Sequence, residues 1–328
     1  MNILFCSVGR RCELLKDFKR TLGDKVKIVA TDVDDTAPAL YFADKSYIVP
    51  RIDDENYLST ILDICRVEEI QTVTTLIDPE ISVLAMHRRS FAEIGVEVLA
   101  PYDETANICL DKFKMYNYLQ LKGIKTVRTY ENLDSFTEDF DAKKIFFPVF
   151  VKPRKGSGSV GARIIDNYKD LTKACNDTPE LIIQEYMNDC LDLDADVYVD
   201  TISHMPVAVF AKKKLSTKIG GANKTISFKD ESLFKFIKEI VREFRFNGPI
   251  DMDFFFKDGV YYLSEINPRF GGAYLHAYGA GVDFVKLIEN NINGIENKED
   301  IGRYDDGVLM MMYDSVVIRK KCELVGSN

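Results

Sequence analysis

The stretch GPIDMDFFFKDGVYYLSEINPRFGG, residues 248–272, carries the side chains with the clearest potential for chemistry. It contains carboxylates at Asp253 and Glu265, an amide at Asn267 and a cation at Arg269. Side chains two apart in a strand share a face, so Glu265 and Asn267 should point the same way. Oxygen ligands of these types suit Mg²⁺, which proteins commonly hold through one or two carboxylates and substrate phosphates. We therefore predict a magnesium site here, at which Mn²⁺ would also be accepted.

A hairpin would bring these groups together. Two apolar runs, 252–256 and 260–263, flank a Lys-Asp-Gly turn, which is typical of a β-hairpin. If the chain reverses within this turn, Asp253 lies across from the strand that carries Glu265. The alternative is a solvated hairpin end with a salt bridge from Glu265 to Arg269.

A second candidate site is the Gly/Ser-rich loop that follows Lys152. Lys152 ends a predicted strand at 149–152, and glycines let backbone N–H groups approach phosphate oxygens without obstruction. The loop leads into another strand at 162–165, whereas a Walker A loop leads into a helix. We therefore predict a lid between antiparallel strands, the alternative being an ordinary flexible hairpin. The loop residues are Gly156, Ser157, Gly158, Ser159, Val160 and Gly161.

Three weaker signals would complete a nucleotide site. The polar run Gln184, Glu185 and Tyr186 ends a predicted strand, where its backbone could bind an adenine edge as a hinge. Lys112 precedes a predicted helix and would place a second cation beside the phosphates. Asp192, expected in a turn after the hinge, could bind ribose hydroxyls. Taken singly, Lys112 and Asp192 could equally be surface charges.

Substrate contacts are expected beyond the carboxyl ends of the first strands. Arg10 and Arg11 open a helix after the first strand, where either could hold a carboxylate or a phosphate. Asp78 and Glu80 follow a later strand and could bind an amine. Asp78 before a proline is also a good helix N-cap, which is the alternative. His276 could touch a substrate or only pack.

Composition and charge exclude several classes of function. The chain has 328 residues, 46% of them hydrophobic, which is enough to bury a large core in two or three compact units. A net charge of −9 without any Lys/Arg-dense run indicates no nucleic-acid partner. The sequence shows no long apolar span and no signal peptide, so we expect no membrane association. Seven scattered cysteines without a C-x-x-C pair favour reduced thiols in the cytoplasm.

The order of predicted elements divides the chain into two parts. Strands at 3–6, 26–31, 47–49, 72–76 and 96–99 alternate with helices at 12–22, 57–66 and 80–93, which predicts a doubly wound parallel sheet. A helical segment at about 103–121 follows. Strands at 149–152, 162–165, 181–184, 195–202 and 207–213, interrupted by helices at 168–175, 231–244 and 284–293, then predict an α+β region with antiparallel sheet.

Together, and in this order, these motifs resemble the ATP-grasp superfamily. The motifs that carry the resemblance are DK ending at Lys112, VKP at 151–153, GSGSVG at 156–161, QEY at 184–186 and EINPRFGG at 265–272. The resemblance covers nearly the whole chain and is strongest to the synthetase domains of the carbamoyl-phosphate synthase large subunit. It implies a Rossmann-like pre-grasp domain at 1–102, a helical linker and lid subdomain at 103–190, and a C-terminal grasp domain at 191–328.

The resemblance also implies roles and chemistry. Members of this superfamily use ATP and Mg²⁺ to convert a small-molecule carboxylate into an acyl phosphate, which an amine then attacks with release of ADP and phosphate. Arg269 would stabilise the transferring phosphoryl group. Lys212 and Lys214 occupy a strand on which many members carry an arginine, although solubilising charges on an edge strand are the alternative. Asp192 stands where members commonly have Glu, and Asp253 where Gln or Glu is common. A homodimer would be usual.

Two other functions compete with the ligase. A non-catalytic ATP sensor or carrier subunit would not need to keep Glu265, Asn267 and Arg269. A dinucleotide-dependent oxidoreductase would need G-x-G-x-x-G after the first strand, where the chain has SVGRR at 7–11. The identities of the acid and the amine, any partner that delivers ammonia, and the pathway are not indicated by the sequence.

Overall fold

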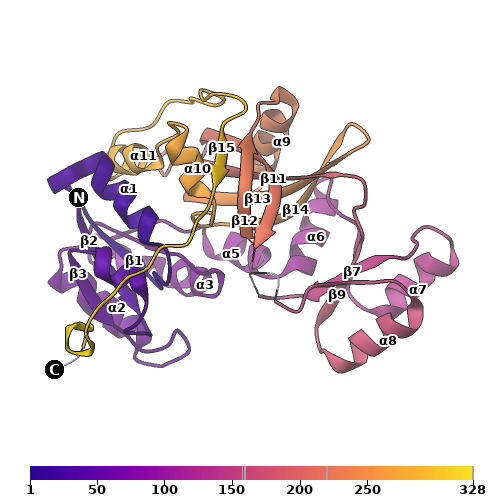
Figure 1. The fold of residues 1–328 in the computed structure, drawn as a ribbon, viewed down its shortest axis with the longest axis horizontal. Coiled ribbons are helices and arrows are strands. Elements are labelled where there is room, and N and C mark those ends of the chain that lie inside the picture. The colour runs from indigo at the N-terminus through magenta and orange to yellow at the C-terminus, as the bar shows by residue number, and fades with distance from the viewer. Residues whose placement is uncertain (157, 159, 219–220, 327–328) are drawn as a thin grey trace.

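The computed structural model describes residues 1–156, 158, 160–218 and 221–326, and begins with a five-stranded parallel sheet (Figure 1). The strands are β1 (Asn2–Cys6), β2 (Lys27–Asp32), β3 (Lys45–Ile48), β4 (Thr72–Thr75) and β5 (Glu97–Val98), in the order β3-β2-β1-β4-β5. The helices are α1 (Cys12–Leu22), α2 (Tyr57–Val67), α3 (Asp78–Met86) and α4 (Arg88–Ala92). The predicted doubly wound sheet is confirmed, but the single helix predicted at 80–93 is wrong, because the chain parts into two helices at His87.

The helical segment predicted at 103–121 consists of two helices. Its parts are α5 (Asp103–Leu110) and α6 (Lys112–Leu121). Asp111, in extended conformation between them, accepts hydrogen bonds from the backbone N–H groups of Phe113 and Lys114 at 3.1 and 3.0 Å. Side-chain capping of this kind satisfies amide donors that a helix start leaves open. Lys112 is consequently the first residue of α6.

A four-stranded antiparallel sheet lies apart from the first, on the right of Figure 1. It contains β6 (Thr129–Tyr130), β9 (Leu181–Glu185), β7 (Val149–Pro153) and β8 (Arg163–Ile165), in that spatial order, with α7 (Leu133–Asp141) and α8 (Tyr168–Asp177). Because β7 pairs antiparallel with β8, the Gly/Ser loop joins two antiparallel strands as predicted. The sequence prediction missed β6 and α7.

A six-stranded antiparallel sheet forms the centre of the molecule, in the order β14-β13-β10-β11-β12-β15. Its strands are β10 (Leu191–Val199), β11 (Pro206–Lys218), β12 (Gly221–Ser227), β13 (Gly248–Lys257), β14 (Val260–Asn267) and β15 (Leu309–Met311). The accompanying helices are α9 (Glu231–Arg242), α10 (Tyr274–Gly279) and α11 (Phe284–Ile292), and 3₁₀ helices lie at Gly23–Lys25, Pro38–Phe42 and Lys321–Glu323. Asp192 lies in β10, so the turn predicted for it is wrong.

The two faces of this sheet differ in polarity. Side chains alternate between the faces along each strand, and paired residues of neighbouring strands point to the same face. On one face, Leu193 lies opposite Phe254 and Ala195 opposite Met252, and α9 packs there through Phe236, whose ring centroid is 6.0 Å from that of Phe254. The other face carries charged side chains along the middle of the sheet, which we call the polar face. Its members are Asp192, Asp194, Asp196, Lys212, Lys214, Asp251, Asp253, Glu265 and Asn267.

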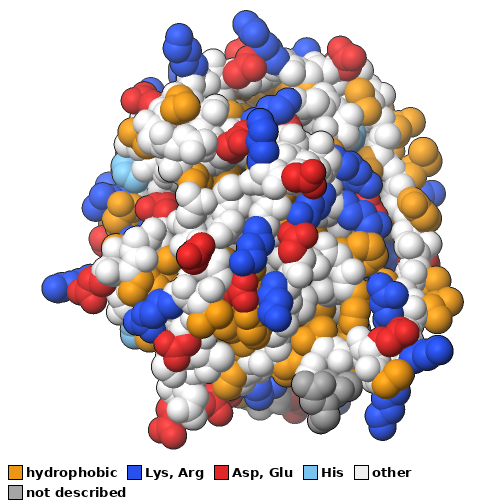
Figure 2. Space-filling view, turned by 90° about the vertical axis from the view of Figure 1, so that its left-hand side faces the viewer, with side chains coloured by type: hydrophobic (Ala, Val, Ile, Leu, Met, Phe, Trp, Pro, Cys, Tyr) orange, Lys and Arg blue, Asp and Glu red, His pale blue; other side chains and the backbone are white. Residues whose placement is uncertain are grey.

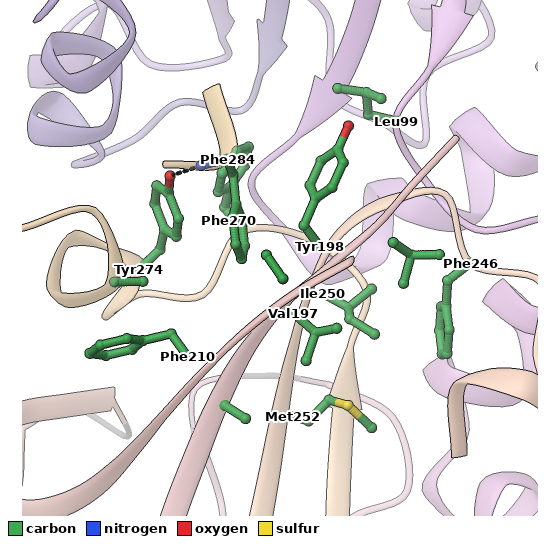
Figure 3. Close-up of a cluster of buried hydrophobic side chains, with 14 of the residues drawn as sticks. Leu99, Val197, Tyr198, Phe210, Phe246, Ile250, Met252, Phe270, Tyr274 and Phe284 are labelled. Carbon is green, nitrogen blue, oxygen red and sulfur yellow. Dashed lines mark hydrogen bonds between the residues drawn. The ribbon is translucent and has the colours of Figure 1, made fainter. Parts of the chain in front are cut away.

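Aromatic side chains close the end of the central sheet nearest the five-stranded sheet (Figure 3). The Tyr274 hydroxyl accepts a hydrogen bond from the Phe284 backbone N–H at 2.8 Å, and their rings lie 4.8 Å apart. Phe270, directly after the predicted metal strand, is buried against Tyr274. Burying a side chain of this size contributes roughly 1.5–3 kcal/mol. This packing anchors the chain that leaves β14.

On the face shown in Figure 2, acidic and basic side chains are interspersed rather than gathered by sign. Hydrophobic side chains stand out along the right-hand edge of that view. None of the helices in the described ranges combines the length and the apolar character needed to cross a bilayer.

Candidate active site

The predicted hairpin forms, with Lys257 paired to Val260 around a turn at Asp258 and Gly259. Both turn residues have positive φ, 51° and 78°, a conformation that glycine adopts without a steric penalty. Asp253 lies across from the Glu265 strand as predicted, and a register shift between Asp253 and Phe254 places it directly opposite Glu265. Two residues further along, on the same face, Asp251 lies opposite Asn267. The oxygen-bearing groups of the two strands therefore form two adjacent cross-strand pairs.

Glu265 meets two lysines that come from other parts of the chain. Lys112, at the start of α6, lies 3.6 Å from one carboxylate oxygen, and Lys152, near the end of β7, lies 3.3 Å from the other. Burial opposes ionisation of Glu265, but the charges of Lys152 and Lys112 outweigh it and lower its pKa. Glu265 is therefore a carboxylate at neutral pH. The predicted alternative, a Glu265–Arg269 salt bridge, is not formed.

The glycine loop lies next to this lysine pair. The Lys112 ammonium group donates a hydrogen bond to the Gly156 carbonyl at 2.7 Å. Gly156, Gly158 and Gly161 all have positive φ, at 119°, 68° and 77°, so the backbone there follows a path that other residues adopt with strain. Val160 is exposed. Ser157 and Ser159, also predicted to contact phosphates, lie outside the described residues.

The predicted hinge forms the end of β9, beside β7. Gln184 points inward and donates a side-chain hydrogen bond to Thr129 at 2.8 Å. The Glu185 backbone N–H donates to the Arg128 carbonyl at 2.9 Å, and the Glu185 side chain is exposed. Tyr186 follows as a half-buried residue. The hinge thus lies one strand away from Lys152, as a nucleotide bound beneath the loop would require.

The two lysines of β11 are paired with carboxylates of the polar face. Lys214 lies 3.0 Å from Asp192 and forms a closer ion pair with Asp253. Lys212 is fully buried, where it contacts Asp194 at 3.1 Å and forms a closer ion pair with Asp196. The alternative that these lysines only solubilise an edge strand is wrong, because β11 is an interior strand of the sheet.

Sequence reasoning missed three buried carboxylates of the polar face, Asp194, Asp196 and Asp251. One carboxylate oxygen from each of the three lies within 4.8 Å of the other two. The signal was present in the run LDLDAD at 191–196, because aspartates at alternate positions of a strand share a face. Lys212 pairs with Asp194 and Asp196, and Arg269 pairs with Asp251, so the cluster is a buried ion-pair network.

Arg269 is held by two carboxylates from different elements, Asp78 of α3 and Asp251 of β13. Its Nε lies 2.9 Å from Asp78 Oδ1, and its Nη1 donates to Asp251 Oδ2 at 3.1 Å. Asp78 is the first residue of α3 and makes no capping hydrogen bond, since Ile77 occupies the N-cap position. The capping interpretation of Asp78 is therefore wrong.

The two arginines after β1 have different environments. The Arg11 guanidinium donates to the carbonyls of Phe270 and Gly271 at 2.9 and 2.8 Å. These contacts occupy Arg11 in joining the two sheets, which corrects its prediction as a free substrate ligand. Arg10 is exposed at the carboxyl edge of the five-stranded sheet, close in sequence to Gly9, whose N–H donates to Asp32 at 2.8 Å.

Two predicted substrate residues are buried. His276 hydrogen-bonds Thr225 at 2.7 Å and packs on the Phe210 ring, and burial lowers its pKa to about 4, so packing explains it better than substrate contact. Glu80 is fully buried and accepts a hydrogen bond from Thr75, which removes it from the residues that can meet a substrate amine. Burial raises the pKa of Glu80 to about 8, with a further increase from Asp32 that a hydrogen bond from Ser7 partly offsets.

The raised pKa of Glu80 predicts a pH-dependent stability. The folded state keeps the Glu80 proton up to about pH 8, whereas the unfolded chain loses it near its ordinary value of 4.5. The wild-type free energy of unfolding should therefore decrease as pH rises from about 5 to 8, by up to a few kcal/mol. Glu80→Gln should flatten this dependence in urea titrations across that range, while Glu93→Gln, at the exposed end of α4, should retain it. An unchanged slope in Glu80→Gln would contradict the assignment.

The donor set fits a hard divalent cation next to phosphate groups. Asp253, Glu265 and Asn267 present oxygen atoms from two adjoining strands, and Lys112 and Lys152 lie where they balance the Glu265 charge. A small hollow here is lined by residues from three regions of the fold, namely Asp78, Lys112, Gly156, Glu265 and Asn267. Carboxylate and amide oxygens are the usual protein ligands of Mg²⁺.

A lid sheet with a glycine loop, facing a central antiparallel sheet with a carboxylate–amide pair, defines a class of nucleotide-dependent enzymes. The family model described as "ATP-grasp domain" matches residues 109–273, half of the chain, and the chain belongs to this family. The model described as "PylC-like, N-terminal domain" matches residues 3–99. The predicted family and fold class, α/β followed by α+β, are thereby confirmed.

Particular relatives lie in several branches of this family. The chain is 26% identical over 258 residues to the carbamoyl phosphate synthase large chain of Sulfolobus acidocaldarius, covering 74% of this chain and 23% of that one. It is 26% identical over 176 residues to a D-alanine–D-alanine ligase of Clostridium botulinum, covering 50% of this chain and 58% of the ligase. It therefore spans less than two thirds of the length of either relative.

A solved structure shares the fold over most of the chain. It is the biotin carboxylase domain dimer of 2-oxoglutarate carboxylase from Hydrogenobacter thermophilus, in complex with MgADP, ADP and bicarbonate. The TM-score is 0.73 at 18% identity, and the match covers 94% of this chain and 73% of that one. A relative of the same fold thus binds ADP with magnesium and forms a dimer.

Proposed function

We propose that this protein is an ATP-dependent ligase that joins a small-molecule carboxylate to an amine, with release of ADP and phosphate. The observation that carries the proposal is the arrangement around Glu265, which lies opposite Asp253 and within 3.6 Å of both Lys112 and Lys152. Four separate elements supply these groups, and three of them, α6, β7 and β14, carry motifs of the family. An ATP sensor would have no need for this arrangement together with Arg269.

The proposed chemistry follows from charge. A carboxylate resists a nucleophile, so transfer of the γ-phosphoryl group converts it into an acyl phosphate with a good leaving group, which the amine displaces. Bound Mg²⁺ would neutralise phosphate charge, held by Asp253, Glu265 and Asn267. Lys112 and Lys152, which contact Glu265, would move to phosphate oxygens. Positioning and electrostatic stabilisation of this kind supply most of the catalysis in phosphoryl transfer.

The remaining parts of the site have proposed roles as well. The loop at 156–161 would cover the phosphates and exclude water, which protects an acyl phosphate from hydrolysis. The hinge at 184–186 would bind adenine, and Asp192 the ribose once it separates from Lys214. Arg269 and Lys214 would stabilise the transferring group, with Lys212 fixed behind them. Arg10 is the remaining candidate for a substrate anion.

We further propose the division of the chain into a pre-grasp domain at 1–102, a linker and lid at 103–190, and a grasp domain at 191–328. Each of the three sheets lies within one of these segments. We propose Mg²⁺ as the working metal, with Mn²⁺ as a substitute, and a homodimer by analogy with the related dimer. A cytoplasmic location is proposed from the free cysteines, which form no disulfide in the described part of the chain.

Substrate-dependent ADP release tests the proposed function. The purified protein is incubated with Mg-ATP and a panel of amino acids and other small carboxylates, alone and in pairs with amines. ADP release that requires both an acid and an amine, together with a condensed product detected by mass spectrometry, is the expected result. ATP binding without ADP release under any combination would favour the sensor and overturn the proposal.

Removing the Lys152 ammonium group should weaken ATP binding. Lys152 is buried beside Glu265, so in Lys152→Ala the phosphates would lose one of two nearby cations. We expect the stabilisation by Mg-ATP, seen as a shift in Tm, to decrease by at least half. The matched control is Lys235→Ala on the exposed side of α9, which should retain the full shift. A full shift in Lys152→Ala would show that the nucleotide binds elsewhere.

A further inference from the structure

We propose that the five-stranded sheet positions the catalytic arginine of the central sheet, with Asp78 as the positioning residue. This inference rests on the proposed function, because it assumes that Arg269 stabilises the transferring phosphoryl group. It assigns to Asp78 a role different from substrate binding and from helix capping. The residues that carry it are Asp78, Arg11, Arg269 and the two residues that follow Arg269.

The first contact fixes the guanidinium itself. Asp78 Oδ1 lies 2.9 Å from Arg269 Nε, and Asp78 Oδ2 accepts a hydrogen bond from Nη2 at 3.3 Å. One carboxylate therefore faces one edge of the planar guanidinium, a geometry that sets its orientation as well as its charge. Both side chains are largely buried, with 13% of Arg269 and 15% of Asp78 exposed. An ion pair this far from solvent is weakly screened by salt.

The second contact fixes the backbone after Arg269. Arg11 donates to the carbonyls of Phe270 and Gly271, so the segment 269–271 is bound on its side chain and on its main chain. Arg11 follows β1 and Asp78 follows β4, and these strands are paired neighbours in the five-stranded sheet. The carboxyl edge of that sheet thus supplies both contacts.

A contact within the central sheet completes the orientation. Arg269 Nη1 donates to Asp251 Oδ2 at 3.1 Å and to the Phe270 carbonyl at 3.2 Å. Asp251 of β13 and Asp78 of α3 contact different nitrogens of the guanidinium. A long arginine side chain has many rotamers, and holding it in one before substrate binds removes that entropic cost from the reaction. Asp78 is engaged in this contact and is not free to bind a substrate amine.

Kinetics of Asp78→Asn test the inference. The amide keeps the size of the side chain but removes its charge, so Arg269 should lose its fixed orientation. We expect kcat to fall on the order of 10²-fold, with the KM for ATP and the Mg-ATP shift in Tm unchanged. Asp78→Glu, which keeps the charge but moves it by one methylene, should recover part of the lost kcat and serves if the amide variant fails to fold.

A double-mutant cycle separates positioning from direct substrate contact. If Asp78 acts through Arg269, adding Asp78→Asn to Arg269→Ala should cause no further loss of kcat. If Asp78→Asn lowers kcat by the same factor in Arg269→Ala as in the wild type, Asp78 does not act through Arg269 and the inference is overturned. An Asp78→Asn variant that retains kcat but has a higher KM for the amine would show direct substrate contact and would overturn it as well.

The matched control is Glu97→Gln, another acid-to-amide change at a contact between the same two regions. Glu97 accepts a hydrogen bond from Asn247 at 2.7 Å, away from Arg269, and its replacement should leave kcat unchanged. If the wild-type enzyme turns over and Asp78→Asn has the same kcat, this inference alone is overturned. Absence of acid- and amine-dependent ADP release in the wild type would overturn the proposed function, and this inference with it.

Discussion

Replacement of Glu265 by glutamine is expected to reduce turnover by at least about 100-fold while the fold stays intact. Glu265 combines three properties that glutamine cannot reproduce together: it is charged, it faces Asp253 across the hairpin, and it lies beside Lys112 and Lys152. Its lowered pKa keeps it ionised at neutral pH, so the substitution removes a full negative charge. Glutamine retains the size of the side chain, which limits the change in packing.

Steady-state ADP release measures this effect, and circular dichroism reports the fold. Glu299→Gln is a suitable control, because it removes the same charge from an exposed ion pair with Lys238. Such surface pairs are worth about 0–1 kcal/mol, so the control should retain both stability and turnover. Normal turnover in Glu265→Gln, or in Glu265→Ala, would remove the metal assignment from the hairpin.

Replacement of Gly271 by alanine is expected to impair both stability and activity. A Cβ at this position would lie 2.6 Å from Asp196 Oδ1 and 2.7 Å from Asp251 Oδ1, closer than such contacts are found. Neither carboxylate can yield freely, because Asp196 is paired with Lys212 and Asp251 with Arg269. Overpacking of a core typically costs about 1–3 kcal/mol. Displacing Asp251 would also release one of the contacts of Arg269.

Urea unfolding and ADP release measure the two consequences of Gly271→Ala separately. Gly279→Ala at the end of α10 is the matched control, because a Cβ there would meet nothing within 4 Å. That variant should keep its free energy of unfolding to within about 0.5 kcal/mol. If Gly271→Ala were as stable and as active as Gly279→Ala, the close approach of the Asp196 and Asp251 carboxylates to Gly271 would be contradicted.

The charged side chains of the polar face neutralise one another in ion pairs. Each cation of the polar face has a carboxylate partner: Lys212 with Asp194 and Asp196, and Lys214 with Asp192 and Asp253. Buried charges are costly unless they are paired, so this pairing lets a dense set of ionic groups occupy the interior. Nucleotide and metal would then replace some of these pairs with stronger ones. The protein is therefore expected to bind its ligands by exchange of partners.

Local patterns in the sequence determined the parts of this site that lie within one hairpin or one loop. Glu265 and Asn267 share a face because strand side chains alternate, and the Lys-Asp-Gly turn closes the hairpin. Asp253 opposes Glu265 through a register shift between Asp253 and Phe254, which the turn does not set. The glycine loop between strands was predicted for the same reason, from residues that are close along the chain. The order of strands and helices likewise predicted the parallel and antiparallel regions.

Tertiary structure alone decided which groups meet across long stretches of chain. Glu265 could have paired with Arg269, four residues away, but pairs with Lys112 and Lys152, while Arg269 pairs with Asp78. Spacing along a strand carries no information on which loop of another sheet will face it. The burial of Glu80 depends in the same way on neighbours that only the folded chain brings together.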